Sequence, residues 1–332
     1  RIHHAHMEED AGKLSHYGDY SLVDLNRAGT PLIEIVSEPD IHSAAAAKAF
    51  ATELYRLMTY AGVTLGDLYH GNMRFDVNVS VAKKGATELG KRAEVKNLNS
   101  FRSVEKAAEY EFIRQVERLE SGEAVVQETR GWNDDKQITT SQRSKEDAQD
   151  YRYMPDADIP PIVLTQQESD SIQAEVPYLP PYYRAHWDSL ELDHSVVDKI
   201  LDYPDIASLL DQILERTDSS IVKRIFNWFA SVASDDLNIE AVKSGLVGPR
   251  RLIELSELVG DNKLSSTGAK DIFLSLFNET YTGKMPIEIA QEKKLLQVSD
   301  EAAIAAIIDE VLADPSSAAS IADIRAGKDK AI

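Results

Sequence analysis

The stretch GNMRFDVNVSV (Gly71–Val81) alternates between apolar and polar residues. Its odd-numbered positions from 73 to 81 are all apolar. This period of two is typical of a half-buried β-strand. The stretch therefore predicts a strand whose exposed face carries an arginine, a carboxylate, an amide and a hydroxyl in a row. These polar residues are Arg74, Asp76, Asn78 and Ser80.

The segments around this stretch alternate between strand and helix patterns. PLIEIVS (Pro31–Ser37) and KRAEVKNLNS (Lys91–Ser100) predict two more strands. A helix is expected from about Ser43 to Ala61, because Ser43 can cap an Ala-rich run that favours a helix. A longer helix is expected from Phe101 to Glu120, where apolar residues recur at spacings of three and four. Together these segments predict an α+β fold with a mixed or antiparallel sheet.

The rest of the chain divides by composition into three further parts. Residues 154–186 are rich in proline, which favours a linker or an ordered crossing segment. From Trp187 onward the apolar spacing is helical throughout, so we expect a helical domain over residues 187–260. A helical tail domain is expected over residues 261–332. Residues 1–153 then form a separate α+β domain.

Composition restricts the class of protein. The 332 residues include no Cys, which excludes disulfides, thiolate metal sites and a Cys nucleophile. Neither a run of about 18 apolar residues nor a secretory signal is visible, so the expected compartment is the cytoplasm. The net charge is −20, of which residues 154–332 contribute −15 and residues 1–153 only −5. Such acidity repels phosphates, so composition alone argues against nucleic acid, and any such contact is expected to be local.

Neither end of the sequence has the pattern of a natural terminus. Arg1 opens directly into RIHHAHMEEDAGK without an initiator Met, and the last residues, Ile321–Ile332, stop within a helix-like pattern. We therefore expect the chain to be a fragment of a longer protein.

Acidic residues lie on the predicted strands of the first 153 residues or at the ends of those strands. Glu34 stands alone among apolar residues, and burying it would be costly unless it is paired or coordinated. Oxygen ligands on several strands suit Mg²⁺, which usually shares phosphate oxygens, and neighbouring Arg and Lys suit a triphosphate. The helix N-terminus at Phe101 would add backbone N–H donors. The candidates for such a site are Glu8, Glu9, Asp10, Glu34, Asp76 and Glu94, with Arg74, Arg92, Lys96, Asn78, Asn97, Asn99 and Ser100.

Two interpretations of these residues stay open at this point. A single acidic residue is typical of a solvated face or a salt bridge, whereas three strands that each carry a carboxylate favour a metal–phosphate site. His3, His4 and His6 could bind a metal, but an ordinary strand end is the preferred interpretation in a chain without Cys. The sequence has no GxxxxGK[ST] loop, GxGxxG fingerprint or GxSxG elbow, so the chemistry does not use those folds.

Six segments, in their order and spacing, resemble the GatB family, the B subunits of the aspartyl/glutamyl-tRNA amidotransferases. The helical part is similar to the same family at Asn227–Trp228 and Ile324–Ala331, so the resemblance covers the whole chain. The six segments are HMEEDAGK (His6–Lys13), DLNRAGTPLIEIVSEPD (Asp24–Asp40), RFDVNVSV (Arg74–Val81), EVKNLNSF (Glu94–Phe101), VQETRGW (Val126–Trp132) and RSKEDAQDYRYMPDADIPP (Arg143–Pro161).

The resemblance implies a cradle-shaped catalytic (kinase) domain, followed by a helical domain and a truncated tail domain similar to YqeY, the last two contacting tRNA. It implies a ligase that converts Glu-tRNA(Gln) to Gln-tRNA(Gln), Asp-tRNA(Asn) to Asn-tRNA(Asn), or both. In this family the B chain phosphorylates the side-chain carboxylate with ATP and Mg²⁺, and ammonia that a glutaminase partner releases from glutamine then replaces the phosphate. The implied assembly is a heterotrimer, whose other members are this amidase-family glutaminase (the A subunit) and a small third chain (the C subunit). The sequence agrees on one point, since it shows no glutaminase nucleophile of its own.

The family's motifs also imply roles for individual residues. Glu9 and Glu34 match the Mg²⁺ carboxylates, while Asp76, Glu94 and Lys96 match catalytic positions of the kinase pocket. The residues implied to contact ATP or the acyl phosphate are Lys13, Arg74, Asn78, Ser80 and Asn97. Secondary candidates are Glu8, Asp10, Asn99 and Arg152.

The chain also departs from the family pattern. The family usually reads GSLRCDANVSV where this chain has GNMRFDVNVSV, and every difference between Met73 and Val81 falls on the apolar face. The family's N-terminal G-L-E-x-H segment, which supplies a Glu and a His to the metal site, is absent, as are its last tail helices. We therefore expect little kinase activity from this chain alone. The competing hypothesis is a tRNA-binding or assembly module without activity, and a weaker one is an unrelated Mg²⁺ phosphotransferase.

Overall fold

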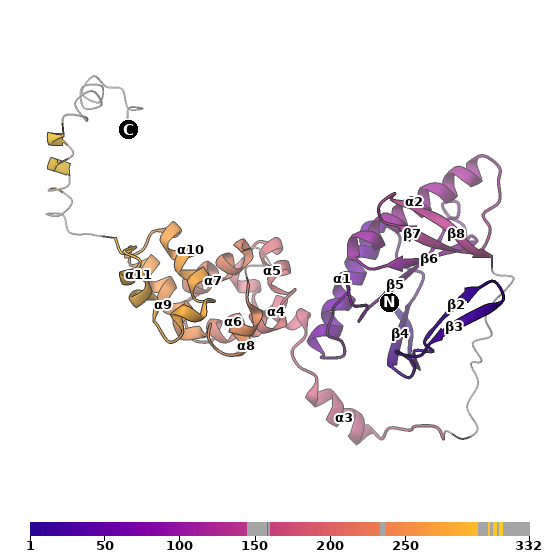
Figure 1. Ribbon diagram of the computed structural model, residues 1–332, viewed down its shortest axis with the longest axis horizontal. Helices are drawn as coiled ribbons and strands as arrows, with labels where there is room; N and C mark the ends of the chain where they lie inside the picture. The colour runs from indigo at the N-terminus through magenta and orange to yellow at the C-terminus, as the bar shows by residue number, and fades with distance from the viewer. Residues whose placement is uncertain are drawn as a thin grey trace. The chain divides into compact units, whose positions relative to one another are not determined.

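The computed structural model describes residues 1–144, 158, 160–232, 237–297, 305, 308–310 and 312–314. The chain divides into two compact units, Arg1–Ala174 and Glu175–Ile332 (Figure 1). The first unit combines small β-sheets with helices, and the described residues of the second unit form helices and the loops that join them. The predicted α+β class of the first part and the helical character of the second are therefore confirmed. The cradle arrangement and the three boundaries between the four predicted parts stay predictions.

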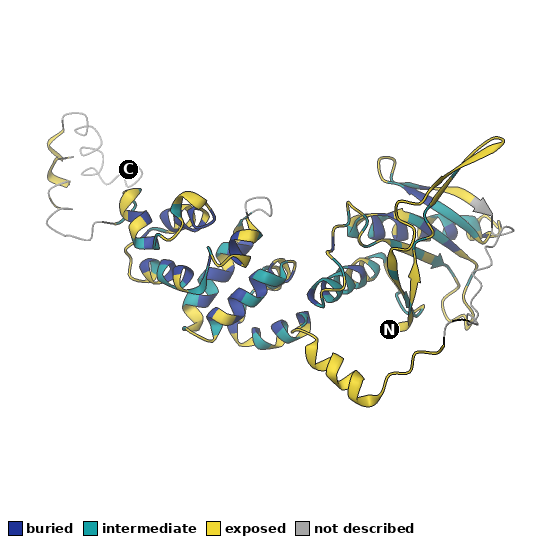
Figure 2. Cartoon of the chain, turned by 60° about the horizontal axis from the view of Figure 1, so that its bottom comes forward, coloured by how far each residue is buried: buried dark blue, intermediate teal, exposed yellow. Residues whose placement is uncertain are grey.

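An antiparallel ribbon of two strands opens the first unit. β1 (Ile2–Glu9) pairs with β4 (Pro31–Ser37), so the strand predicted for PLIEIVS is confirmed. Between them, β2 (Lys13–Tyr17) and β3 (Tyr20–Asp24) form a separate hairpin that is almost entirely exposed (Figure 2). Because β4 runs back along β1, residues far apart in the sequence lie side by side in the ribbon.

Four strands form the larger sheet of the first unit, in the order β5-β6-β7-β8. They are β5 (Phe75–Ser80), β6 (Arg92–Leu98), β7 (Glu128–Asn133) and β8 (Ile138–Ser144). β6 and β7 run parallel, whereas the two outer pairs are antiparallel. The predicted mixed sheet is therefore confirmed.

The strand predicted from Gly71 to Val81 begins later than its alternation suggested. Gly71 has a φ of 73°, and its backbone N–H donates to the Leu68 carbonyl at 3.2 Å. A left-handed glycine is typical of a turn, so the chain becomes a paired strand only at Phe75. The apolar and polar faces predicted for the rest of the strand are retained.

Both long helices of the first unit pack on the same face of the four-stranded sheet (Figure 1). α1 (Ala44–Tyr60) and α2 (Phe101–Glu120) agree with their predicted limits to within one residue. Ser43 and Ser100 cap them, and each hydroxyl accepts a hydrogen bond from a backbone N–H three residues on, at 3.1 and 3.0 Å. The core between helices and sheet contains Ala51, Val95, Leu98, Val104, Ala107 and Trp132. The other face of the sheet is left to the polar residues of β5 and β6.

Residues 154–186 contain two helices that their proline content did not predict. α3 (Gln166–Glu175) begins with a capping box, in which Thr165 Oγ1 accepts from Glu168 N–H at 3.2 Å and Glu168 Oε2 accepts from Thr165 N–H at 2.8 Å. α4 (Pro180–His186) begins with proline, whose missing N–H leaves no helical hydrogen bond unmade in the first turn. The described part of the crossing segment is therefore partly helical.

Short helices make up the second unit beyond α4, as the amphipathic patterns predicted. Trp187, Phe226 and Phe273 are almost completely buried among them. Residues 298–332 of the expected helical tail domain fall mostly outside the described residues. The helices are α5 (His194–Ile200), α6 (Pro204–Leu214), α7 (Ser219–Ser231), α8 (Ile239–Lys243), α9 (Pro249–Gly260), α10 (Ser266–Ser275) and α11 (Pro286–Glu292), with 3₁₀ turns at Asp188–Leu190 and Glu279–Tyr281. Across the described ranges of both units, no helix combines the length and apolar character that crossing a membrane requires.

Candidate functional site

The β1–β4 ribbon brings a histidine and two carboxylates together. His6 lies opposite Glu34 in the strand register, and His6 Nε2 is 3.0 Å from Glu34 Oε2 and 3.6 Å from Glu8 Oε2. The candidate ligand atoms of the three residues all lie within 4.8 Å of one another. Imidazole nitrogen and carboxylate oxygen are ligands of divalent cations. We call His6, Glu8 and Glu34 the cation cluster.

The cation cluster differs from the predicted ligand pair in one position. Glu9 pairs with Pro31 at the next position of β1, so its side chain leaves the ribbon on the face opposite to that of Glu8 and Glu34. The structure therefore brings Glu8 to Glu34 and does not bring Glu9 there. His6 lies among the carboxylates, so both interpretations of the histidines, a metal ligand and an ordinary strand end, stay predictions. Glu34 itself is half-exposed and paired with His6, so the free-energy cost expected for a buried, unpaired carboxylate does not arise.

We expect Glu34→Gln to weaken the binding of Mn²⁺, used as a probe for Mg²⁺, by at least about tenfold. Even outer partners of metal ligands contribute this much to affinity, and Glu34 supplies a candidate ligand oxygen and a negative charge. Electron paramagnetic resonance titration of free Mn²⁺ measures the change. The matched control is Glu109→Gln, on the exposed face of α2. Equal Mn²⁺ binding by the two variants would contradict a cation site at Glu34.

A second polar group lies on the open face of the four-stranded sheet. Lys96 Nζ on β6 is 2.8 Å from Asp76 Oδ2 on β5 and 3.4 Å from Glu94 Oε1. Thr129 Oγ1 on β7 donates to Glu94 Oε2 at 3.0 Å. The polar face that alternation predicted for Asp76 is therefore confirmed, and Glu94 and Lys96 of β6 meet it there. We call these three residues with Thr129 the lysine cluster.

Lys96 stays positively charged in this setting. Burial lowers the pKa of Lys96, but the hydrogen bond and charge of Asp76, together with Glu94, outweigh burial and raise it above the ordinary lysine value. The ammonium group is thus a fixed positive charge beside two carboxylates at neutral pH. The ammonium can donate hydrogen bonds to phosphoryl oxygens, while the two carboxylates give the group a net charge of −1 that a divalent cation would offset.

We expect Asp76→Asn to lower the pKa of Lys96, since burial then acts against a weaker opposing charge. In the unchanged chain the ion pair stabilises the fold below the ordinary lysine pKa, and this contribution is lost as pH rises through the raised pKa. Acetylation needs the neutral amine, so Lys96 of the variant should react at lower pH. Mass spectrometry across a pH series measures this, with Glu109→Gln as the control. The same pH profile in both variants would contradict the assignment.

The remaining predicted residues take separate positions. Asn78 and Ser80 lie on the face of β5 that carries Asp76, opposite Glu94 and Arg92 of β6. Lys13 begins the exposed hairpin, where it pairs with Asp24. The other candidates are Asn97, which has a φ of 68° beside a shift in the β5–β6 register, Asn99, which follows β6, and Arg152, which lies outside the described residues. Their predicted contacts with ATP stay predictions.

Asp10 takes a place that the sequence did not predict. Its Oδ2 lies 3.6 Å from Nη2 of Arg27 and 3.6 Å from Nη2 of Arg74. Among the described residues it is not one of the group that could hold a metal ion. Asp10 therefore serves as the counter-ion of two arginines and links Arg74 to the turn that carries Arg27.

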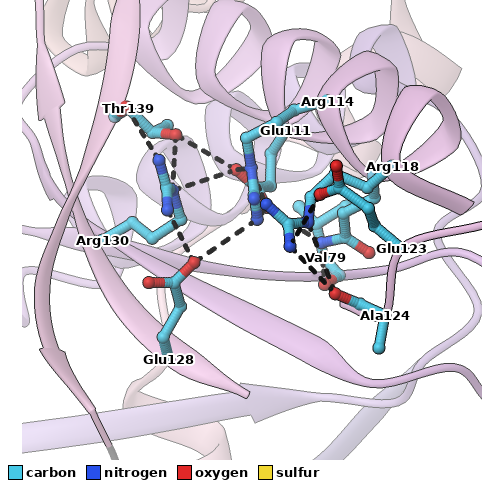
Figure 3. Close-up of polar contacts among 10 residues, drawn as sticks. Val79, Glu111, Arg114, Arg118, Glu123, Ala124, Glu128, Arg130 and Thr139 are labelled. Atoms are coloured by element: carbon cyan, nitrogen blue, oxygen red, sulfur yellow. Dashed lines mark hydrogen bonds and ion pairs between the residues drawn. The ribbon is translucent and has the colours of Figure 1, made fainter. Parts of the chain in front are cut away.

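A buried ion network supports the sheet from its helix-covered side (Figure 3). Glu111 of α2 is fully buried and accepts hydrogen bonds from Arg114, from Gln115 Nε2 at 3.0 Å and from Thr139 Oγ1 at 3.1 Å. Arg130 Nε of β7 lies 3.5 Å from Glu111 Oε2. The network fixes α2 against β7, in which Thr129, the residue before Arg130, donates a hydrogen bond to Glu94.

Sequence reasoning missed Thr129 and Glu111, and it named His6 only as a possible metal ligand that was not preferred. His6 could have been found from the spacing His6-x-Glu8, which places both side chains on one strand face. Thr129 lies in the VQETRGW motif, but only the pairing of β6 with β7 shows that it contacts Glu94. Glu111 is one acidic residue among several on α2, and its burial is set by tertiary packing.

Two family models match this chain. The model described as the GatB/GatE catalytic domain matches residues 1–170, which include the cation cluster and the lysine cluster. The model described as the GatB domain matches residues 208–332.

Curated relatives match along nearly the whole chain. Those from Trichodesmium erythraeum and Thermotoga petrophila are 42% and 40% identical to it, over 98% and 100% of this chain and 66% and 69% of their own lengths. The relative from Persephonella marina is 42% identical, over 94% of this chain and 66% of its own length. All three are named as the B subunit of an aspartyl/glutamyl-tRNA(Asn/Gln) amidotransferase. The chain spans about two thirds of the length of these relatives, and it belongs to the GatB family of aspartyl/glutamyl-tRNA amidotransferase B subunits.

Proposed function

We propose that this chain works as the carboxylate-activating member of a tRNA-dependent amidotransferase. The substrates are Glu-tRNA(Gln), Asp-tRNA(Asn) or both, and the products are Gln-tRNA(Gln) and Asn-tRNA(Asn). A side-chain carboxylate oxygen attacks the γ-phosphorus of ATP and ADP leaves, which gives an acyl phosphate. Ammonia from the glutaminase partner then attacks the acyl carbon, phosphate leaves and the amide remains. The small third chain completes the proposed heterotrimer.

The observation that carries this proposal is the presence of the cation cluster and the lysine cluster in the unit that matches the GatB/GatE catalytic domain. Carboxylates and a histidine suit a divalent cation, and the ammonium of Lys96 provides hydrogen-bond donors for a phosphoryl group whose charge the cation would offset. His6, Glu8 and Glu34 are the residues proposed to hold Mg²⁺. When bound, Mg²⁺ would neutralise phosphate charge.

Each polar residue of the sheet face has a proposed part in this reaction. Lys96 provides positive charge to the transferred phosphoryl group, and Asp76 and Glu94 hold its ammonium in place. Asn78 and Ser80 lie on the same face as hydrogen-bond donors for phosphate oxygens. Phosphoryl transfer depends mainly on such positioning and on charge neutralisation.

The test is whether misacylated tRNA stimulates ATP hydrolysis by this chain assembled with its glutaminase partner and the small third chain. The proposal predicts strong stimulation by Glu-tRNA(Gln) or Asp-tRNA(Asn) and little by the same tRNA without its amino acid, because the carboxylate is the phosphoryl acceptor. Hydrolysis that ignores the amino acid would point to an unrelated Mg²⁺ phosphotransferase. Binding of tRNA without any hydrolysis would favour the binding or assembly module.

A further inference from the structure

Asp10 holds two guanidinium groups at one point of the first unit. Each group lies 3.6 Å from Oδ2, while Oδ1 accepts a hydrogen bond from Gly12 N–H at 2.8 Å. The Asp10 side chain is only 10% exposed, whereas those of Arg27 and Arg74 are 55% and 58% exposed. A fixed, buried carboxylate thus presents two accessible arginines.

The backbone around this point fixes the geometry before any ligand arrives. Asp10 N–H donates to the Thr30 carbonyl, and the Asp10 carbonyl accepts from Gly29 N–H, both at 2.9 Å. The Arg27 carbonyl accepts from Thr30 N–H at 3.1 Å, which closes the turn that carries Arg27. Preformed geometry of this kind lowers the entropy cost of binding.

The charges at this point do not balance. One carboxylate compensates one of the two guanidinium charges, and a separation of 3.6 Å is longer than a hydrogen bond. In the part of the chain that the structure describes, neither guanidinium has another ion pair or a hydrogen bond. The two groups therefore offer a net positive charge and several N–H donors to an anion.

We propose that Arg27 and Arg74 form an anion clamp that binds a terminal phosphoryl group, that of ATP or free phosphate, with Asp10 as its positioning residue. Planar guanidinium groups bind phosphate oxygens in pairs. Asp10 follows Glu8 of the cation cluster by two residues, and Arg74 precedes Asp76 of the lysine cluster by two, so the clamp lies along the chain next to both. This inference rests on the proposed function, because Arg74 is one of its phosphate contacts. It adds Arg27, Asp10 and the net positive charge that they leave.

The clamp is tested by calorimetric titration of the chain with inorganic phosphate, without Mg²⁺ and at constant ionic strength. We expect Arg27→Gln to bind phosphate at least roughly tenfold more weakly, which is the effect of losing a charged hydrogen bond. Arg250→Gln removes the same charge from an exposed residue of the second unit and should bind like the unchanged chain. Arg27→Lys keeps the charge, loses the planar donor pair and should also bind more weakly. If Arg27→Gln does not fold, phosphate binding by Arg27→Lys provides the test of the clamp. Unchanged binding by the folded Arg27 variants, or no phosphate binding by the original chain, would overturn the clamp.

Titrations with ATP and with tRNA separate the sources of phosphate. The clamp predicts weaker ATP binding and unchanged tRNA binding in Arg27→Gln, and the reverse pattern would overturn it in favour of an RNA contact. The assembled enzyme separates the clamp from the proposed function. If phosphate binding needs Arg27 but misacylated tRNA stimulates no ATP hydrolysis, the clamp stands and the proposed function fails. If hydrolysis is normal in Arg27→Gln and phosphate binding is unchanged, the clamp fails and the proposed function stands.

Discussion

Replacing Asp76 with asparagine is expected to lower tRNA-dependent ATP hydrolysis by the assembled enzyme about 100-fold or more, while tRNA binding stays intact. Asp76 Oδ2 is 2.8 Å from Lys96 Nζ and supplies the largest opposing effect to burial of the ammonium. Without this carboxylate, Lys96 loses both its orientation and part of the cause of its raised pKa. A charge placed away from the phosphoryl oxygens contributes little to transfer.

A matched ion pair provides the control for Asp76. Lys106 Nζ and Glu109 Oε2 on α2 are also 2.8 Å apart but lie on an exposed helix face. Glu109→Gln should leave hydrolysis unchanged. Steady-state ATP hydrolysis with saturating misacylated tRNA, together with a separate tRNA-binding titration, measures both variants. Hydrolysis by Asp76→Asn at the rate of Glu109→Gln would mean that the lysine cluster is only structural.

Replacing Glu111 with alanine is expected to reduce the free energy of unfolding by about 3–5 kcal/mol. The carboxylate is fully buried, and its loss leaves Arg114 and Arg130 with Glu128 as their one shared counter-ion, so that one of the two positive charges is uncompensated (Figure 3). Thr139 Oγ1 also loses its acceptor at 3.1 Å. Removing one member of a buried ion network costs more than the network contributes as a whole, because the remaining buried charges are no longer balanced.

Urea unfolding measures this loss, and hydrogen exchange shows where it acts. We expect faster exchange in α2, β7 and β8, and little change in the second unit. Glu109→Ala, two positions earlier on the same helix, should change the free energy of unfolding by no more than about 0.5 kcal/mol, as is usual for an exposed position. A loss of less than about 1 kcal/mol in Glu111→Ala would contradict this account and show that Glu128 alone compensates the two arginines.

Local sequence signals predicted much of the first unit. The alternation in β5 and β6, the capping serines at Ser43 and Ser100, and the helical spacing of α2 all act within a few residues of the chain. These features follow from neighbouring residues, so they can be read without knowing the fold. The helices of residues 166–186 are not evident from proline content, because proline breaks a helix in its interior but, like Thr165-x-x-Glu168, also marks a helix start.

The site was predicted only as far as single strands allow. Asp76, Asn78 and Ser80 share a face of one strand, and this is visible from alternation. The contact between His6 and Glu34 depends on the β1–β4 register. That register also decides that Glu8, and not Glu9, lies on the same face of the ribbon as Glu34. Asp10, Arg27 and Arg74 come together from three segments, so a single sequence contains no signal for their contact.

Transfer of ¹⁸O from substrate to phosphate tests most directly whether ATP phosphorylates the side-chain carboxylate. The assembled enzyme is given ATP, glutamine and tRNA misacylated with glutamate or aspartate whose side-chain carboxylate carries ¹⁸O, and mass spectrometry of the released phosphate follows the label. The proposed reaction breaks the bond between the acyl carbon and the bridging oxygen, so each phosphate formed with the amide should carry a single labelled oxygen. Amide formation with unlabelled phosphate would contradict carboxylate phosphorylation and, with it, the role proposed for the sheet face of Asp76, Glu94 and Lys96.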